Sequence, residues 1–306
     1  MLCMLMSTKI CDKTLGSTLV RYKNYHQAET EVSQAGAMFW ITAILFLLSL
    51  DEPCESKSYL RVRHGRDVVD GEFPFVVVLL RLKSNTSSLR FCTGSAISQN
   101  WILTAAHCVV GKQMNSLLIW HTNFTAQPVP FEMKSSVQKI IVHPAYVNHK
   151  KGKSFLYNDV SLLLVTKLAL SNFGRLLAVD HLTMVGLPVI YVGGGGTDKT
   201  NPGRDGIRQL QVGEAAIESC DTQHKYVICL VANCGNKTDE VQKPWYGDSG
   251  GPLLYDGRII GVCSSGSIDT TKVKESYAAV SPHIDWIYNV IHNTFNAVTT
   301  SVPASN

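Results

Sequence analysis

The chain has 306 residues, of which 45% are hydrophobic and 17% are charged. This length and this hydrophobic content suffice for a large core in one or two domains. The net charge of +4 is small and no long run of like charges occurs, which argues against a nucleic acid or an acidic membrane as the partner. We therefore expect no nucleic-acid partner.

Met38–Leu50 is the first distinctive segment, an apolar run with polar residues on both sides. It is shorter than the roughly 20 residues that cross a bilayer, and it is typical of the apolar region of a secretory signal peptide. Because residues 1–37 precede it, we expect them to be an upstream extension that is absent from the mature protein. The alternative is a short signal anchor at residues 38–50. Residues 51–61 are then a short propeptide.

Short apolar runs separated by turn residues predict a series of strands after Phe73. The predicted strands are Val76–Leu80, Phe91–Ile97, Trp101–Thr104, Ser116–Trp120, Val137–Val142, Val160–Val165, Leu187–Val192, Arg258–Cys263 and Ser276–Val280. Many short strands with little helix are typical of antiparallel barrels. The expected fold class is therefore all-β.

One helix is predicted close to the C-terminus. It starts at Ser281-Pro282, and apolar residues then recur at helical spacing at Ile284, Ile287, Tyr288 and Ile291. A separate glycine run at residues 193–196 precedes neither a lysine–serine pair nor a helical pattern. We expect a tight turn there and no phosphate-binding loop.

Three motifs carry the side chains needed for nucleophilic catalysis. Ser249 lies in Gly-Asp-Ser-Gly-Gly-Pro, where backbone N–H groups can stabilise negative charge on a carbonyl under attack. Such a serine needs an adjacent base and a third group that orients the base. His107 in Leu-Thr-Ala-Ala-His-Cys and Asp159 in Asn-Asp-Val-Ser-Leu-Leu supply them. In the chain order His, Asp, Ser, these motifs resemble those of the trypsin/chymotrypsin-like serine proteases, from about Val62 to Ile291.

The resemblance implies two packed six-stranded antiparallel β-barrels with a C-terminal α-helix, which we expect to pack on the second barrel. It implies a serine endopeptidase in which Ser249 is the nucleophile, His107 the base and Asp159 the group that orients His107. The N–H groups of Gly247 and Ser249 would form the oxyanion hole. The protease domain would span residues 62–295, with a tail at 296–306, and no motif implies a cofactor or a metal.

The resemblance also predicts a zymogen that is cleaved after Arg61. The new N-terminus at Val62 would enter the core, and its ammonium group would pair with Asp248, because a buried charge is tolerated only when it is paired. Arg63 and His64 depart from the small or apolar residues usual in the family at these positions. The alternative interpretation of this segment is a plain basic linker.

Nine cysteines suggest an oxidising compartment if they pair. By resemblance, Cys92 pairs with Cys108 and Cys220 with Cys229. We expect Cys234 and Cys263 to bridge each other, although spacing alone does not fix connectivity. Cys54 has no evident partner. Three sequons, compatible with secretion and glycosylation, begin at Asn85, Asn123 and Asn236.

The substrate pocket departs from the family's pattern. Counting back from Ser249 gives Lys243 at the position where trypsin-like relatives carry an aspartate. Ser264-Ser265-Gly266 resembles the strand that pairs with the substrate backbone, and Glu275 falls near the far wall of the pocket. A Lys–Glu pair there would fill or neutralise the pocket. We therefore expect an enzyme that is not a plain arginine or lysine cutter, with an apolar preference, or an acidic one if Lys243 is unpaired.

Two alternatives stay open from the sequence. Gaps within Cys234–Tyr246 would displace the count and bring Asp239 or Glu240 into the pocket. The chain would otherwise be a protease-like binding or regulatory protein with impaired activation, which the unusual residues after Val62 favour and the intact triad opposes. For the protease, we expect a secreted monomer with protein or peptide substrates, an activating protease and protein inhibitors as partners.

Overall fold

The computed structural model describes residues 65–83, 88–125, 131–147, 157–195, 209–220, 226–232, 244, 246–266 and 274–299. These residues belong to one compact unit, Tyr59–Asn306. The predicted upstream extension, signal segment and propeptide, together with the cleavage site at Arg61 and Val62, lie outside the described residues. Within the described part of the chain, no helix has the length and apolar character needed to cross a membrane.

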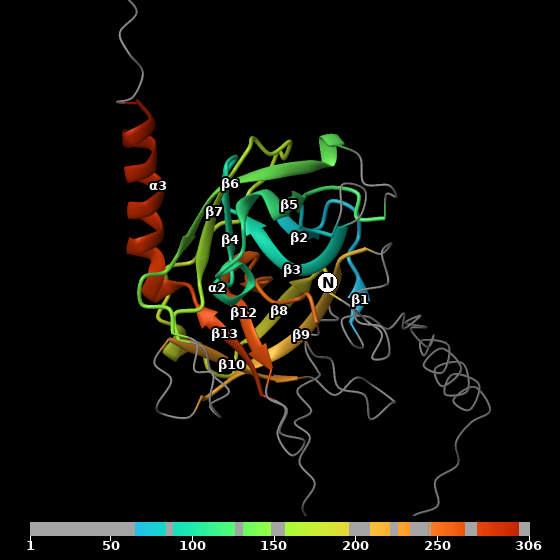
Figure 1. The fold of residues 1–306 in the computed structure, drawn as a ribbon. Helices are drawn as coiled ribbons and strands as arrows, with labels where there is room; N and C mark the ends of the chain where they lie inside the picture. The colour runs from blue at the N-terminus through green and yellow to red at the C-terminus, as the bar shows by residue number, and fades with distance from the viewer. Residues whose placement is uncertain are drawn as a thin grey trace, which may run out of the picture. The chain divides into compact units, whose positions relative to one another are not determined.

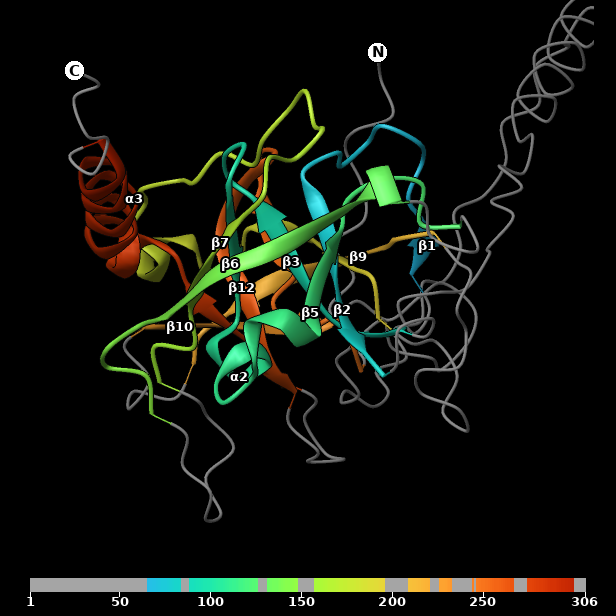
Figure 2. The same ribbon diagram turned by 45° about the horizontal axis from the view of Figure 1, so that its top comes forward.

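Six antiparallel strands close into the first barrel, in the order β2-β3-β4-β7-β6-β5 (Figure 1). They are β2 (Val76–Leu82), β3 (Ser88–Ala96), β4 (Trp101–Thr104), β5 (Leu117–Trp120), β6 (Lys134–Val142) and β7 (Ser161–Val165). Val76–Leu80 is buried throughout, so it forms a strand without the polar alternation of a half-exposed one. In Figure 2, β6 crosses the front of this barrel as one long strand.

The second barrel is formed by β8 (Pro188–Gly193), β9 (Gln211–Glu218), β10 (Val227–Ala232), β11 (Pro252–Tyr255), β12 (Arg258–Gly266) and β13 (Lys274–Ala279). It closes because β8 pairs with both β11 and β9. The short strand β1 (Arg66–Asp67) adds to β9. The predicted fold class of two six-stranded antiparallel barrels is confirmed.

The hydrophobic core has two parts. One cluster fills the first barrel and continues into the second through Val192, Val212, Leu254 and Val262. The other lies within the second barrel around Tyr191, Leu253 and Tyr277. Because the first cluster crosses from barrel to barrel, the two barrels share buried apolar surface, the dominant stabilising contribution to folding.

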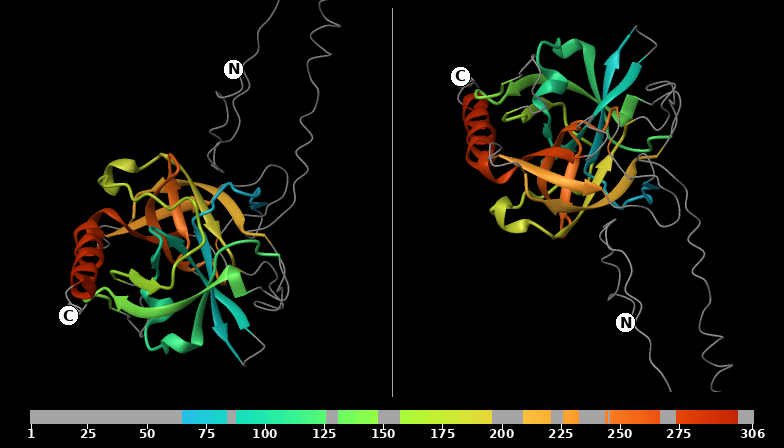
Figure 3. Two further views of the ribbon diagram at one scale, coloured as in Figure 1. Left: turned by 90° about the horizontal axis from the view of Figure 1, so that it is seen from above. Right: turned by 90° about the horizontal axis from the view of Figure 1, so that it is seen from below.

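Short helical turns connect the strands. They are α2 (Ala106–Val109), η1 (Met114–Ser116), η2 (Phe131–Met133), η3 (His181–Met184) and η4 (Ser281–His283). The predicted C-terminal helix is α3 (Ile284–Thr299), which lies at one side of the barrels in both views of Figure 3. We expected this helix to pack on the second barrel, but one of its side chains contacts the first barrel. The Trp286 ring lies 4.8 Å from the ring of His143, which follows β6 of the first barrel.

Candidate active site

His107 and Asp159 come together because of a strand pairing. β4 pairs with β7 so that Thr104 lies opposite Ser161. His107 follows the first of these strands and Asp159 precedes the second, so both emerge at the same end of the barrel. His107 donates its backbone N–H to Oδ1 of Asp159 at 2.8 Å, and its Nδ1 lies 2.6 Å from Oδ2. Asp159 is fully buried, and this double contact fixes the orientation of the imidazole.

Ser264 provides a third donor to the same carboxylate, a contact that the sequence did not indicate. Its hydroxyl donates to Oδ2 of Asp159 at 2.6 Å. The pairing of β12 with β13 shifts between Cys263 and Ser265, which leaves Ser264 as the extra residue of a β-bulge. A bulge turns a side chain away from the regular alternation. Ser264 had been predicted only as part of the strand that pairs with substrate, and no residue pattern marks the bulge.

Ser249 lies on a turn just before β11, and this turn contacts the first barrel. Its carbonyl accepts the N–H of Thr93 at 2.8 Å, and the N–H of Gly250 donates to Cys263 O at 2.7 Å. Gly247 and Gly250 have φ values of +96° and +85°, which residues with side chains rarely adopt. A Cβ at Gly250 would also lie 2.2 Å from Oγ1 of Thr104. The glycines are therefore needed both for the turn and for its close approach to the first barrel.

His107 and Ser249, the predicted base and nucleophile, make no hydrogen bond to each other. Both lie against Cys108: its Sγ is 3.8 Å from Nε2 of His107 and 3.6 Å from the carbonyl oxygen of Ser249. Nε2 of His107 makes no hydrogen bond to Oγ of Ser249 in this structure of the free chain. Such contacts are often loose before substrate binds and tighten in the complex with substrate.

Asp248 is buried directly beneath the turn that carries Ser249. Its Oδ1 accepts the N–H of Gly195 at 2.7 Å. A Cβ at Gly193 or Gly195 would lie 2.0 or 2.4 Å from this oxygen, so the glycine run wraps around the carboxylate. Within the described part of the chain, the N–H groups of Gly247 and Ser249 donate to no backbone carbonyl.

Thr93 ties this turn to the glycine run. Its hydroxyl donates to Gly247 O at 2.7 Å and accepts the N–H of Gly194 at 2.9 Å. One side chain on β3 of the first barrel thus holds two loops of the second. The sequence analysis did not single out Thr93, because a threonine inside a strand carries no signal of such a role.

The predicted pocket residues are described in part. Glu275 is buried on β13, opposite Gly266 of β12. Burial raises the pKa of the Tyr277 hydroxyl well above its ordinary value, and the charge of Glu275 contributes to this rise. Lys243 and the alternatives Asp239 and Glu240 lie outside the described residues.

The structure contains the two disulfides implied by the resemblance, Cys92–Cys108 and Cys220–Cys229. The predicted bridge between Cys234 and Cys263 is wrong, because Cys263 is a free thiol. Its side chain points into the core of the second barrel, where it packs in the cluster of Tyr191 and Tyr277. Burial, with the charges of Asp248 and Glu275, raises the pKa of this thiol well above its ordinary value.

One group of metal-type ligands occurs among the described residues: Cys92, His107 and Cys108. The two cysteines are joined in a disulfide and offer no thiolate, the form that binds metal ions. Of the three sequons, only that of Asn123 lies in the described part of the chain. Asn123 is exposed, and its Oδ1 accepts a hydrogen bond from the Thr125 hydroxyl at 3.0 Å.

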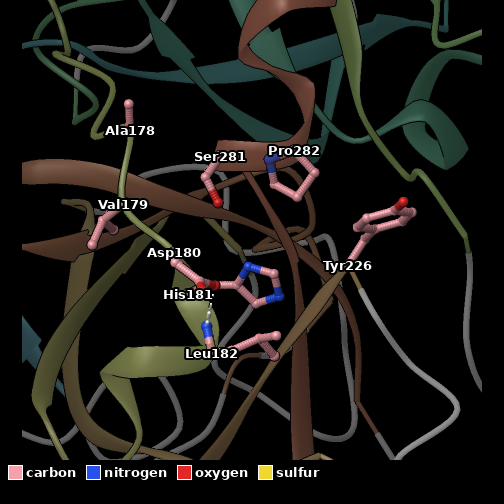
Figure 4. A pocket seen from close by; sticks show the side chains of 8 residues that line it. All are labelled: Ala178, Val179, Asp180, His181, Leu182, Tyr226, Ser281 and Pro282. Carbon is pink, nitrogen blue, oxygen red and sulfur yellow. Dashed lines mark hydrogen bonds between the residues drawn. The ribbon is translucent and has the colours of Figure 1, made fainter.

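A groove of about 610 Å³ lies away from these residues (Figure 4). It is lined by Ala178, Val179, Asp180, His181, Leu182, Tyr226, Ser281 and Pro282. None of them belongs to the predicted triad, oxyanion hole or substrate pocket. The groove is therefore separate from the candidate active site.

Comparison with known proteins agrees with the two-barrel fold. The sequence model of the family described as Trypsin matches residues 62–287. The chain belongs to the trypsin family. Among its relatives, chymotrypsin-like elastase family member 1 of Felis catus is 30% identical over 273 residues, which cover 83% of this chain and 98% of the relative.

Two further relatives are similar to this chain at a comparable level of sequence identity. The Homo sapiens protein named chymotrypsin-like elastase family member 1 is 29% identical over 234 residues, covering 70% of this chain and 86% of the relative. Duodenase-1 of Bos taurus is 26% identical over 259 residues, covering 81% and 95%. As a member of the trypsin family, the chain is a serine-type endopeptidase.

Proposed function

We propose that the chain is a secreted serine endopeptidase that hydrolyses peptide bonds through His107, Asp159 and Ser249. The observation that carries the proposal is the double contact of His107 with the fully buried Asp159. A buried carboxylate that accepts the Nδ1–H of an imidazole leaves Nε2 as the basic nitrogen. The contacts of Nε2 of His107 and of the Ser249 carbonyl oxygen with the same Sγ of Cys108, at 3.8 and 3.6 Å, support the pairing of these two residues.

The first half of the reaction forms an acyl-enzyme. Oγ of Ser249 attacks the scissile carbonyl carbon while Nε2 of His107 takes the hydroxyl proton. The carbonyl oxygen becomes an oxyanion that accepts the N–H groups of Gly247 and Ser249. The imidazolium, stabilised by Asp159, then gives its proton to the leaving amine as the C–N bond breaks.

The second half releases the acid product. A water molecule gives a proton to Nε2 of His107 and attacks the ester carbon of the acyl-enzyme. The same two N–H groups stabilise the second oxyanion. When the tetrahedral intermediate collapses, His107 returns the proton to Oγ of Ser249, so the enzyme is regenerated unchanged.

A fluorophosphonate probe tests this proposal. The chain is expressed from Met38 and cleaved after Arg61, and the label on Ser249 is located by mass spectrometry. We expect labelling of the cleaved protein and none of the Ser249→Ala variant. Absence of an adduct on Ser249 in cleaved, folded protein would overturn the proposal in favour of a protease-like binding protein.

Activation is the second part of the proposal. Cleavage after Arg61 frees the amine of Val62 to pair with Asp248, which is buried next to the oxyanion loop and can be reached only by a group that enters the core. After treatment with a trypsin-like protease, the Arg61→Gln variant should not give Val62 as its N-terminus and should stay unlabelled. N-terminal sequencing of the treated parent chain should give Val62. Sequencing of the secreted protein before treatment tests whether residues 38–50 are removed.

The third part concerns specificity. We propose that Lys243 and Glu275 enter the substrate pocket and that the enzyme is not a plain arginine or lysine cutter. The buried position of Glu275 on β13 supports an internal role for this carboxylate. Profiling the cleaved protein on a peptide library tests the proposal. A strong preference for arginine or lysine before the cut would contradict it.

A further inference from the structure

The proposed oxyanion hole needs two N–H groups that point at one oxygen atom. They belong to Gly247 and Ser249, and their relative direction depends on the backbone angles of Gly247 and Asp248, because each peptide group is rigid. Glycine has more backbone freedom than other residues, and Gly247 uses it with a φ of +96°. The contacts around the peptide group that joins Gly247 to Asp248 therefore decide whether the two donors converge.

The side chain of Thr93 holds this peptide group. Its hydroxyl donates to the carbonyl oxygen of Gly247 at 2.7 Å, and the same hydroxyl oxygen accepts the N–H of Gly194 at 2.9 Å. A hydroxyl has one proton and two lone pairs, so both contacts form at the same time. Thr93 thereby links the peptide between the two proposed donors to the glycine run at residues 193–195, which wraps around Asp248.

The two segments that Thr93 joins also touch each other. A Cβ at Gly247 would lie 2.8 Å from the Cα of Gly195, and a Cβ at Gly195 would lie 2.6 Å from the carbonyl oxygen of Tyr246. Real Cβ atoms do not approach other atoms this closely, so the two backbones pack directly on one another. The peptide group that carries the N–H of Gly247 is thus placed by Gly195, and the next peptide group by Thr93.

Thr93 is a rigid anchor because of its place in the first barrel. It is fully buried on β3, where it pairs with Val78 of β2, and its carbonyl accepts the hydroxyl of Thr104 on β4 at 2.8 Å. A β-branched side chain has few rotamers, so a fixed backbone also fixes the hydroxyl. The N–H of Thr93 donates to the Ser249 carbonyl at 2.8 Å, which holds the other end of the same turn.

Gly194 reaches this hydroxyl because it has no side chain. A Cβ there would lie 2.5 Å from Cγ2 of Val78. β8 ends at Gly193, so the N–H of Gly194 lies beyond the last paired residue of that strand and bonds to the other barrel instead. A replacement for Thr93 that lacks a hydroxyl would remove this contact and the contact to Gly247 together.

We propose that Thr93 is a positioning residue for the oxyanion hole, and that its hydroxyl fixes the peptide group between the two donors. The proposal rests on the proposed function, because it concerns the N–H groups of Gly247 and Ser249. Thr93 is fully buried, so it acts through the backbone of the turn and not on the substrate. Its loss should lower kcat and leave KM nearly unchanged, because an oxyanion forms only as the carbonyl is attacked.

Two replacements of Thr93 remove one branch of the side chain each. Thr93→Val keeps the shape and loses the hydroxyl, whereas Thr93→Ser keeps the hydroxyl and loses the methyl group. We expect Thr93→Val to lower kcat about 10- to 100-fold, since misplaced catalytic groups and lost oxyanion donors have effects of this size or larger. Thr93→Ser should stay close to the parent chain. Steady-state kinetics are measured on the chain cleaved after Arg61, with a substrate chosen by library profiling.

Two inhibitors with the same peptide sequence separate a positioning role from a general structural one. A peptide aldehyde adds to Ser249: its carbonyl carbon bonds to Oγ, the hydroxyl proton moves to Nε2 of His107, and the aldehyde oxygen becomes an oxyanion. The corresponding peptide alcohol occupies the same site without forming an oxyanion. In Thr93→Val the dissociation constant of the aldehyde should rise about 10- to 100-fold, as kcat falls, while that of the alcohol is unchanged.

Ser161→Ala is the control for the loss of a buried hydroxyl. Ser161 is fully buried on β7 of the same barrel, and its hydroxyl donates to Ile141 O at 3.1 Å and not to the turn of Ser249. This variant should keep the ratio of the two dissociation constants found in the parent chain. If Ser161→Ala or Thr93→Ser changes the ratio as much as Thr93→Val does, the inference is overturned, because the Thr93 hydroxyl then has no specific effect.

The outcomes separate failure of the inference from failure of the proposed function. If the cleaved parent chain reacts with a fluorophosphonate and binds the aldehyde more tightly than the alcohol, but Thr93→Val matches it in kcat and in both dissociation constants, the inference is wrong and the proposed function stands. If the folded, cleaved parent chain neither reacts nor distinguishes the aldehyde from the alcohol, the proposed function fails and the inference with it. Should Thr93→Val not fold, Thr93→Ala also lacks the hydroxyl and needs less space, and an unchanged aldehyde affinity there would overturn the inference.

Discussion

The hydroxyl of Ser264 and the Nδ1 of His107 meet at the same oxygen, Oδ2 of Asp159, each at 2.6 Å. Ser264 comes from a bulge in the second barrel and Asp159 from the first. Asp159 thus has its carboxylate held from both barrels, and a relative movement of the barrels would disturb the orientation of His107.

Ser264→Ala should therefore slow the reaction without weakening substrate binding. A hydrogen bond to a charged group contributes about 1.5–3 kcal/mol, so we expect kcat to fall about 10- to 100-fold with KM nearly constant. Steady-state kinetics on a peptide ester or amide checks this. Ser161→Ala is the matched control. It also removes a buried serine hydroxyl, but this hydroxyl donates to the backbone oxygen of Ile141 and not to Asp159. Equal loss of kcat in both variants would show that the Ser264 hydroxyl has no specific role.

Gly195 is expected to control the oxyanion loop through Asp248. A Cβ at this position would lie 2.4 Å from Oδ1 of Asp248 and 2.6 Å from its backbone nitrogen, so Gly195→Ala must displace the residue before Ser249. Because a misplaced oxyanion donor lowers kcat about 100- to 1000-fold, the fluorophosphonate reaction rate should fall on this scale. Gly111→Ala, at a φ of +70° with open space around the Cβ, strains the backbone away from the site and should leave the rate unchanged. A normal rate in Gly195→Ala would argue against the role of Asp248 in holding the loop.

Three histidines should make the fold less stable in mildly acidic solution. Burial lowers the pKa of His121, and burial also lowers those of His143 and His283, with further contributions from neighbouring histidines. The unfolded chain then takes up protons near pH 6.5 while the folded chain does not, so the free energy of unfolding falls as the pH drops from about 6.5 toward the lowered values. Urea denaturation between pH 8 and pH 5 measures this decrease.

His121 allows the effect to be assigned to one group. Its ring is buried and its Nδ1 has no hydrogen-bond partner among the described residues. His121→Gln removes the titration while keeping a polar side chain, so its unfolding free energy should fall less steeply with decreasing pH than that of the parent. Parallel curves for parent and variant would show that His121 does not resist protonation in the folded state.

The sequence predicted the fold where strands are strongly apolar and failed where the pattern is mixed. Trp101–Thr104 was predicted with its correct bounds, because four buried residues follow one another there. Gln211–Glu218 was missed because it alternates around a glycine and alanines. Val227–Ala232 was also missed, although its six residues are all apolar. Pro252–Tyr255 was missed because a proline opens it. Each of these strands pairs both with a strand that is next to it in the chain and with a more distant one: β9 with β8, β10 and the short β1, β10 with β9 and β13, and β11 with β12 and β8.

The site shows the same division. His107, Asp159 and Ser249 lie in local motifs and could be named in advance. The contacts that Ser264 and Thr93 make depend on a bulge and a cross-barrel hydrogen bond, which leave no pattern in neighbouring residues. The bridge of Cys263 was mispredicted because spacing says nothing of the direction of a side chain, and β12 turns this thiol inward.

Cys263 should be chemically inert as long as the protein is folded. Its thiol is buried in the second barrel and its pKa is raised well above the ordinary value, chiefly by burial, so almost no reactive thiolate is present at neutral pH. We expect the peptide that contains Cys263 to stay unmodified by iodoacetamide in the native protein and to be alkylated completely, without prior reduction, once the protein is unfolded in urea. The disulfide-bonded Cys92 and Cys108 serve as the internal control, since their peptides should require a reductant. Alkylation of Cys263 in the native state would mean that the second barrel opens readily. If Cys263 were alkylated after unfolding only in the presence of a reductant, it would be disulfide-bonded, in contradiction to the structure.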